Sequence, residues 1–288
     1  GTQTNSGDWT ASTFLQFLQG ILDGSGTLTT TGPITWGSGT MTGSGAITIA
    51  PSGKLALTTT GTHILSRTIN NNGQLHFLNG QLSMAGATIN NNAGSTFAVL
   101  ALSPVTIPAI GGINTINNSG LLKKMGSAAA TFDSALGGVT LNNTGMTDVR
   151  NGALNLNGPI TQLPGNTLSG GTWQVYPTGT LGTGGSIIRT VSSGTTINMV
   201  GGNAGFAALS SLTTNNGTLN FTLGGTPRIG YCIDTSRVFN EGTELVETTE
   251  QDAPATAANR AVTWILLNRT PSGTPTPEKR TQAAVSQV

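Results

Sequence analysis

Two acidic side chains are the only carboxylates between residues 24 and 225, and they decide whether this stretch could cleave a glycan. Glycosidic cleavage needs a pair of carboxylates, or an acidic cluster that holds a metal ion. Asp133 and Asp148 are 15 residues apart, less than one of the repeat units described below, so stacked equivalent positions would not bring them together. We expect both to be turn residues. The acidic segment 241–252 matches no catalytic spacing and is expected to be a solvated loop, so the sequence predicts no enzyme.

The other side chains that could hold a metal or act as nucleophiles are few. His63 and His76 are the only histidines, and both are expected to point outward or to lie at corners. Cys232 is the only cysteine, so no internal disulfide can form. It is expected to be a small buried hydrophobe, with an intermolecular bridge or a reactive thiol as the alternative. Glycine pairs such as 184–185 and 201–202 open no helix and so cradle no phosphate. No cofactor and no metal site is expected.

Binding chemistry has a few candidates among the aromatic residues. Trp36, Trp173 and Tyr176 lie in glycine-rich turns, and exposed aromatic rings there could stack on sugar rings. Burial at a corner is the competing expectation for these residues. The threonine runs 29–31 and 58–60 are similar to the threonine faces of ice-binding coils, but ordinary strand surface explains them better.

Composition excludes several classes of protein. Charged residues are 8%, hydrophobic residues 36%, and the formal net charge is +1, so the chain should fold rather than remain disordered. No basic stripe exists to neutralise phosphates, which makes nucleic acid an unexpected partner. The apolar run 261–267 is far shorter than the roughly 20 residues that a membrane-spanning helix needs. A start at Gly1 without Met suits a processed secreted chain and equally a recombinant fragment.

One phrase returns along the chain: an apolar residue, two or three asparagines, a glycine, a polar residue and another apolar residue. The phrase occurs at 69–77, 89–97, 116–121, 141–146 and 212–221. Asn70, Asn90, Asn117 and Asn142 are separated by 20, 27 and 25 residues, a period in the range of solenoid repeats. These four residues and Asn215 are expected to form a structural ladder at one corner of the stacked repeats.

Short alternating stretches separate these phrases, such as 46–49, 54–57 and 153–156. Alternation with a period of two predicts half-buried strands, and Asn-Gly clusters supply the corners between them. An antiparallel meander would use the same signals, but the recurrence of one phrase favours a right-handed parallel β-solenoid. Leu75 and Ile89, which flank the Asn-Gly corners, are then expected to face the interior.

The two ends differ in pattern from the middle. Ser12 precedes Phe14, Leu15, Leu18 and Leu22, a spacing that predicts a short amphipathic helix. We therefore expect an N-terminal helical cap over residues 1–23 and solenoid repeats over 24–225. The segment 226–288 contains all five glutamates and a stretch rich in Pro and Thr, which predicts an accessory module and a tail.

The phrase 37–49 and the Asn-Asn-x-Gly units resemble the repeats of bacterial β-helical surface proteins, namely autotransporter passengers and filamentous-haemagglutinin-like adhesins. The resemblance covers about 200 of the 288 residues. It implies export, display on a cell surface, and adhesion or matrix formation. The function expected is an extracellular structural or adhesive rod, and head-to-tail self-assembly into a surface filament is a further expectation. Its partners would be copies of itself, head-to-tail or lateral, or cell-surface and matrix glycans. A glycan-binding or glycan-processing β-helix, such as a phage-type receptor-binding spike, is the alternative.

Overall fold

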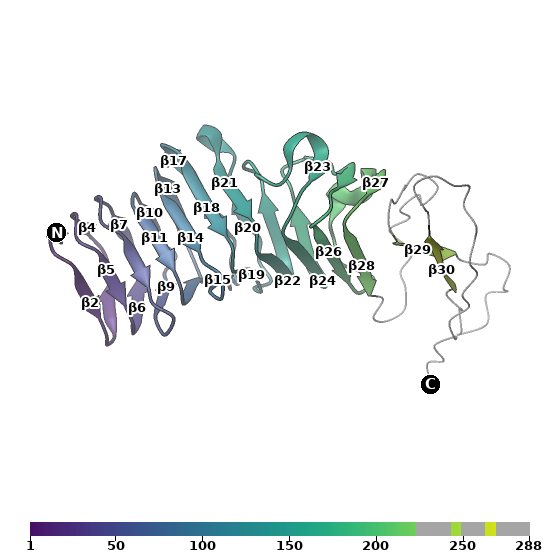
Figure 1. Cartoon of the computed structure of the whole chain (residues 1–288). Helices are drawn as coiled ribbons and strands as arrows, with labels where there is room; N and C mark the ends of the chain where they lie inside the picture. Colours follow the sequence, from purple (N-terminus) through teal and green to yellow (C-terminus); the bar gives the residue numbers. More distant parts are fainter. Residues whose placement is uncertain (223–242, 249–262, 269–288) are drawn as a thin grey trace.

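The computed structural model describes residues 1–222, 243–248 and 263–268. The first of these segments consists mainly of short strands that lie side by side along one elongated body (Figure 1). Strands one chain turn apart in the sequence pair in parallel, so the chain coils and each turn adds a layer. The predicted all-β parallel solenoid is therefore confirmed. Its right-handed winding stays a prediction.

Successive turns place their strands in three columns, where a column is the set of paired strands at one position of the coil. The first column contains β2 (Trp9–Ala11), β5 (Leu28–Thr30), β8 (Ile47–Ile49), β11 (Thr68–Asn71), β14 (Thr88–Asn91), β18 (Asn114–Asn118) and β21 (Val139–Asn143). A separate short sheet contains β23 (Thr167–Leu168), β25 (Thr190–Val191) and β27 (Thr214–Asn215).

The middle and third columns belong to one continuous sheet. The middle column contains β3 (Leu15–Phe17), β6 (Pro33–Trp36), β9 (Lys54–Leu57), β12 (Gln74–Phe77), β15 (Thr96–Val99), β19 (Leu121–Lys124), the first halves of β22 (Met146–Leu156) and β24 (Thr172–Gly182), β26 (Thr196–Val200) and β28 (Thr218–Thr222). The third column contains β1 (Thr2–Thr4), β4 (Ile21–Asp23), β7 (Gly39–Met41), β10 (Thr62–Leu65), β13 (Gln81–Ala85), β16 (Val105–Ile107), β17 (Ala109–Gly111), β20 (Ala130–Phe132) and the second halves of β22 and β24.

The interior is built from apolar residues that alternate with polar ones along each strand. In the first column Ile69 pairs with Ile89 and Ile89 with Ile116, and all three are fully buried. In the middle column Leu75 pairs with Phe97, and both are fully buried. The inward orientation predicted for Leu75 and Ile89 is confirmed. Because like residues stack on like, each turn buries its apolar face only with the help of its neighbours.

A row of half-buried asparagines runs along the first column. Asn90 Nδ2 donates to Asn70 Oδ1 at 2.9 Å, Asn117 Nδ2 to Asn90 Oδ1 at 2.9 Å, and Asn142 Nδ2 to Asn117 Oδ1 at 3.2 Å. Gln162 ends this row, because its Nε2 donates to Asn142 Oδ1 at 2.6 Å. These amides are half-buried and stack one per turn.

A second asparagine row, one residue further along each strand, is buried and was not expected. Asn71 Nδ2 donates to Asn91 Oδ1 at 2.7 Å, Asn91 Nδ2 to Asn118 Oδ1 at 2.6 Å, and Asn118 Nδ2 to Asn143 Oδ1 at 2.7 Å. The same donors also reach backbone carbonyls at the start of the next middle-column strands. This buried row therefore satisfies polar groups at the corner where the first column meets the middle column.

Asn215 does not belong to the half-buried asparagine row, contrary to the expectation from the repeated phrase. It pairs with Val191 in the separate short sheet, and it is buried. Its Oδ1 accepts the Gly217 N–H at 3.1 Å, as Asn71 Oδ1 accepts the Gly73 N–H at 3.1 Å. Asn215 is thus equivalent to the buried row, because both residues stand two positions before the corner glycine.

Corner glycines are required by close approach of the chain to the previous turn. A Cβ atom placed on Gly145 would lie 2.3 Å from the Gly120 carbonyl oxygen. Real Cβ atoms do not approach an oxygen so closely, so a larger residue would force successive corners apart. Gly73 and Gly120 are limited in the same way, so at these corners glycine is a packing requirement of the stack. Gly94 differs, because no atom lies within 4 Å of its Cβ position and its φ of 82° is what favours glycine there.

The helix predicted at the N-terminus is absent. Residues 15–17 and 21–23 form β3 and β4, which pair with the following turn through Leu15 opposite Ile34 and Ile21 opposite Thr40. Gly20 between them has a φ of 110°, which an α-helix does not contain. The helical spacing of the apolar residues was a coincidence of two short strands. Parallel pairing begins at Thr2, so it includes the residues expected to form a separate cap.

Helical geometry in the described residues is confined to three short 3-10 segments, η1 (Ala135–Gly137), η2 (Pro164–Asn166) and η3 (Ala207–Ser211). Within these same residues, no helix has the length and apolar character needed to cross a bilayer.

The segment 226–288, predicted to be an accessory module, is described only in part. Its strands β29 (Thr243–Thr248) and β30 (Thr263–Asn268) form an antiparallel pair. Cys232, the Pro/Thr-rich tail and half of the acidic segment 241–252 lie outside the described residues.

Candidate functional site

The outward-facing residues of the middle column form a row along the solenoid, one residue per turn. We call it the outer row, and it contains Gln16, Thr35, Ala56, His76, Ala98, Lys123, Asp148, Gln174, Asn198 and Asn220. Its last five residues carry a charge or an amide, whereas alanine alternates with larger polar residues in the turns before them. Polar binding chemistry therefore gathers near the β22, β24, β26 and β28 end of this column.

An ion pair stands at the start of this polar region. Arg150 Nε donates to Asp148 Oδ2 at 2.8 Å, and the Asp148 side chain is only 2% exposed while that of Arg150 is 45% exposed. The hydrogen bond to Asp148 raises the pKa of Arg150 above its usual value. Asp148 Oδ1 is buried without a hydrogen-bond partner in the described structure. The register of β22 shifts between Val149 and Asn151, which places Arg150 where the strand turns the corner.

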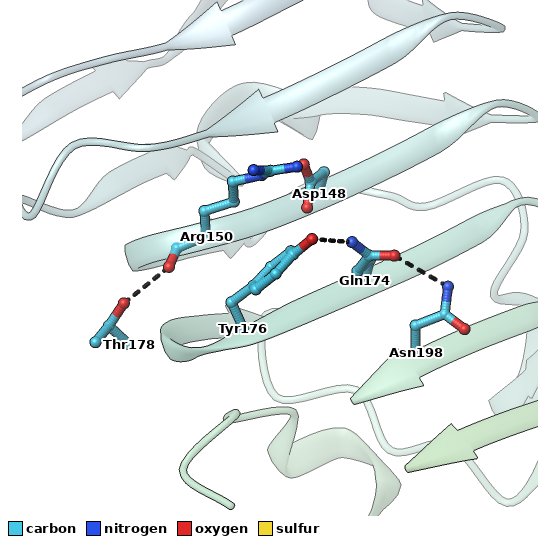
Figure 2. A network of polar contacts seen from close by, with 6 residues as sticks. All are labelled: Asp148, Arg150, Gln174, Tyr176, Thr178 and Asn198. Atoms are coloured by element: carbon cyan, nitrogen blue, oxygen red, sulfur yellow. Dashed lines mark hydrogen bonds and ion pairs between the residues drawn. The ribbon is translucent and has the colours of Figure 1, made fainter. Parts of the chain in front are cut away.

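Arg150 connects this ion pair to Tyr176 on the next turn (Figure 2). The guanidinium carbon lies 4.9 Å from the centroid of the Tyr176 ring, within cation–π range. The Arg150 backbone carbonyl accepts a hydrogen bond from Thr178 Oγ at 2.8 Å. Two contacts to β24 thus fix the position of Arg150.

A chain of amides continues from Tyr176 along the outer row. Gln174 Nε2 donates to the Tyr176 hydroxyl oxygen at 2.7 Å, and Gln174 Oε1 accepts from Asn198 Nδ2 at 3.1 Å, as Figure 2 shows. Asn198 Oδ1 in turn accepts from Asn220 Nδ2 at 2.8 Å. Each of the two inner amides uses one N–H and one oxygen contact in this chain. The remaining N–H and oxygen lone pair are available to a ligand.

A groove of about 450 Å³ lies beside these amides. It is lined by Gln174, Tyr176, Asn198, Val200, Leu219, Asn220 and Phe221. The lining combines planar amides, two aromatic rings and apolar surface, and none of the described residues in it is charged. Such a lining can hydrogen-bond hydroxyl groups and cover apolar C–H surface.

The two tryptophans expected as sugar-stacking candidates are buried, so neither can meet a ligand at the surface. Trp36 is 0% and Trp173 is 1% exposed. Their indole N–H groups donate to the carbonyl oxygens of Ser38 at 3.0 Å and Gly170 at 3.1 Å. Both are core residues with a satisfied polar atom. Of the three aromatic candidates, only Tyr176 is partly exposed.

The two histidines differ in orientation. His63 is fully buried and packs edge-to-face on Trp36 with ring centroids 5.2 Å apart, so the expectation of an outward or corner histidine is wrong for it. Burial lowers the pKa of His63 below its usual value, although its ring nitrogens lie 3.1 Å from the carbonyl oxygens of Gln81 and Trp36. His76 is half-buried in the outer row. Burial and, to a smaller extent, Lys54 lower the pKa of His76.

The two carboxylates of the repeats lie in different columns. Asp133 follows β20 and accepts the Ser134 N–H at 2.7 Å, as a turn residue does. Asp148 lies inside β22, so the expectation that it is a turn residue is wrong. Across residues 1–222 and the two described C-terminal strands, no group of three or more His, Cys, Asp or Glu could hold a metal ion.

Two buried cationic side chains were missed at the sequence level. Lys124 takes the inward position that Val99 occupies in the turn before, and its Nζ donates to the carbonyl oxygens of Gly126 and Asn151. Burial lowers the pKa of Lys124 to about 8. Arg67 is also buried, and its Nη2 donates to the Gly26 carbonyl oxygen at 3.1 Å, two turns away. Aligning the repeats on their alternation would have shown Lys124 at an apolar position.

Comparison of the chain with models of protein families, with curated proteins and with solved structures found no match.

Proposed function

We propose that this chain is an extracellular structural or adhesive rod. The observation that carries the proposal is the ladder of parallel strands, which runs from Thr2 to Thr222. A stack of this kind turns a short repeat into an extended surface, which is useful for holding or joining other molecules. Low charge supports the same reading, since the outward strand residues of the first column are threonine and asparagine from β5 to β21.

Export and surface display are part of this proposal. They rest on the resemblance of the repeats to those of bacterial β-helical surface proteins and on a charged content of 8%. Assembly into filaments is a further part, because each end of a solenoid presents a strand edge that can pair with another chain. A head-to-tail contact between copies would propagate unless its rotation closed a ring.

Glycan binding is the second candidate, and the groove beside Tyr176 favours it. The described lining of the groove offers amides and aromatic rings without charge, a combination suited to hydroxylated ligands. Cleavage of a glycan is less well supported. Asp148, the carboxylate in the described network beside the groove, is paired with Arg150 and buried, whereas cleavage uses two carboxylates across the scissile bond.

The test of the rod function is to display the full chain on bacterial cells that lack adhesins of their own. Attachment to polysaccharide-coated and uncoated surfaces and clumping of cells are then counted. The matched control is Ile89→Asp, which buries an unpaired charge and should prevent folding. We expect attachment or clumping to rise with the parent chain and to return to the background with the control. Equal counts for cells with and without the parent chain contradict the proposed function.

A further inference from the structure

We propose that the groove beside Tyr176 binds a neutral polysaccharide whose chain lies parallel to the solenoid axis. This inference rests on the proposed function, because it names the class of ligand to which the rod would adhere. Three observations support it. The amides form a row along the solenoid axis, the Tyr176 ring is held in place beside the groove, and no described residue of the groove lining is charged.

The amide row gives the orientation. Gln174, Asn198 and Asn220 lie opposite one another in β24, β26 and β28, so their side chains follow the axis at about 4.8 Å per strand. An extended polysaccharide presents its hydroxyl groups at a comparable repeat, one sugar unit after another. A chain lying along the row could therefore offer a hydroxyl to each amide in turn. A chain lying across the strands would meet only one amide.

The Tyr176 ring provides the apolar contact. Arg150, on the preceding strand β22, lies over the ring, whereas the groove is lined from β24 and the following strands β26 and β28. The hydroxyl is held by Gln174 at 2.7 Å. The ring is thus held in place before a ligand arrives, which lowers the entropy lost on binding. Val200, which lies two residues after Asn198 on the same face of β26, extends the apolar lining on which the C–H face of a sugar can rest. Phe221 closes the groove from the interior side, because it pairs with the buried Met199 and packs against the core.

The charges argue for a neutral ligand. Arg150 is the cation of the polar network in Figure 2, and its guanidinium is already paired with Asp148 at 2.8 Å. Among the described residues, none that lines the groove is charged. An acidic polysaccharide would therefore find no unpaired cation there, whereas neutral hydroxyl groups match the free N–H and oxygen positions of the amides.

The experiment is affinity electrophoresis of the full chain in gels that contain one soluble polysaccharide each. The neutral probes are hydroxyethylcellulose, laminarin, yeast mannan and galactomannan, and the acidic probes are alginate and heparin. We expect at least one neutral probe to retard the chain. Tyr176→Ala should weaken that binding by about tenfold, the size expected for a lost aromatic contact. Asn198→Ala, which interrupts the amide row, should weaken it severalfold.

Two further variants keep the result interpretable. His76→Ala changes the same outer row several turns away from the groove and should leave the retardation unchanged. Tyr176→Phe keeps the ring and should retain most of the binding, which separates loss of the contact from misfolding of the Ala variant. The proposal is overturned if no neutral probe binds, if Tyr176→Ala and Asn198→Ala bind as the parent does, or if only the acidic probes bind. If cells that display the chain still attach while the electrophoresis gives one of these results, only the polysaccharide proposal fails and the rod function stands. The failures of the two proposals are therefore distinguishable.

Discussion

Buried polar side chains hold neighbouring turns together at individual residues. Arg67, His63 and Lys124 lie inside the solenoid, and each faces backbone carbonyl oxygens at a corner. Corners interrupt the regular pairing between strands, and carbonyl oxygens there can accept hydrogen bonds from side chains. Long cationic side chains can reach these oxygens, while their methylene groups pack with the apolar interior.

Lys124 gives this residue-scale account a test by pH. Its pKa falls from the usual 10.5 to about 8 in the folded chain, so between these values the unfolded chain binds more protons. The free energy of unfolding should therefore rise as the pH increases from 8 to 10.5. Urea unfolding at several pH values measures the rise. Lys124→Met should flatten it, whereas Lys123→Met, on the outer face, should keep it; equal slopes for both variants contradict the assignment.

The groove residue Tyr176 shows what sequence reasoning could predict at the scale of one residue. Glycine-rich surroundings selected Trp36, Trp173 and Tyr176 alike, because local composition does not reveal which side of a strand faces inward. Only the register between turns separates them, and it places Trp36 and Trp173 in the core. The partner Arg150 could not be predicted either, since it meets Tyr176 from another strand, at a bulge. Gln174 could have been predicted, because it stands two residues before Tyr176 in β24, where alternation places both on one face.

At the scale of elements, the repeated phrase predicted the strands and corners where it was clear and misled where it was short. Its period placed Asn70 and Asn90 in one row and Ile89 in the core. It placed Asn215 one residue out of register, because the phrase there contains an additional polar residue. The prediction of an N-terminal helix was wrong for a related reason. The spacing of Leu15 and Leu18 fits one turn of an α-helix, and the strands are revealed only by the pairing of β3 with β6 in the following turn of the solenoid.

The buried asparagine row should contribute more stability than the half-buried asparagine row of the first column. Asn118 accepts from Asn91 and donates to Asn143 Oδ1 and to the Met146 carbonyl. Asn118→Ala leaves these buried groups unpaired, at a cost of about 1–3 kcal/mol for each. The matched control is Asn117→Ala, one residue earlier in the half-buried row, which should cost about 1 kcal/mol because water can replace the lost partner. Urea unfolding compares the two variants, and equal losses contradict the role of the buried row.

The corner glycines predict a second effect at the element scale. Gly145→Ala would set a Cβ atom against the Gly120 carbonyl oxygen at 2.3 Å, so the corner must shift. Overpacking of this kind costs about 1–3 kcal/mol, and the midpoint of urea unfolding should fall accordingly. Gly7→Ala serves as the control, because no atom lies within 4 Å of its Cβ position. A Gly145→Ala variant as stable as the parent shows that the corners are not tightly stacked.

On the scale of the whole molecule, stability and shape come from contacts between neighbouring turns. Burial of each apolar face requires the turns on both sides, so the repeats cannot fold singly and the solenoid extends as turns are added. Its first column presents an uncharged surface of threonine and asparagine, while charge and amides gather on the outer row near Tyr176. One body thus combines a neutral face suited to lateral contact with a separate groove suited to a ligand.

In-register parallel stacking is the central claim, and an engineered disulfide tests it most directly. Thr88 and Thr115 are partners on neighbouring strands, at a separation of about 4.8 Å, which lies within the range that a disulfide bridges. In a Cys232→Ser background, Thr88→Cys with Thr115→Cys should form a disulfide on mild oxidation, as detected by mass spectrometry of the peptides. Thr88→Cys with Thr140→Cys, two strands apart, should not. Rapid oxidation of the second pair, or none of the first, would contradict the parallel solenoid and favour the antiparallel meander.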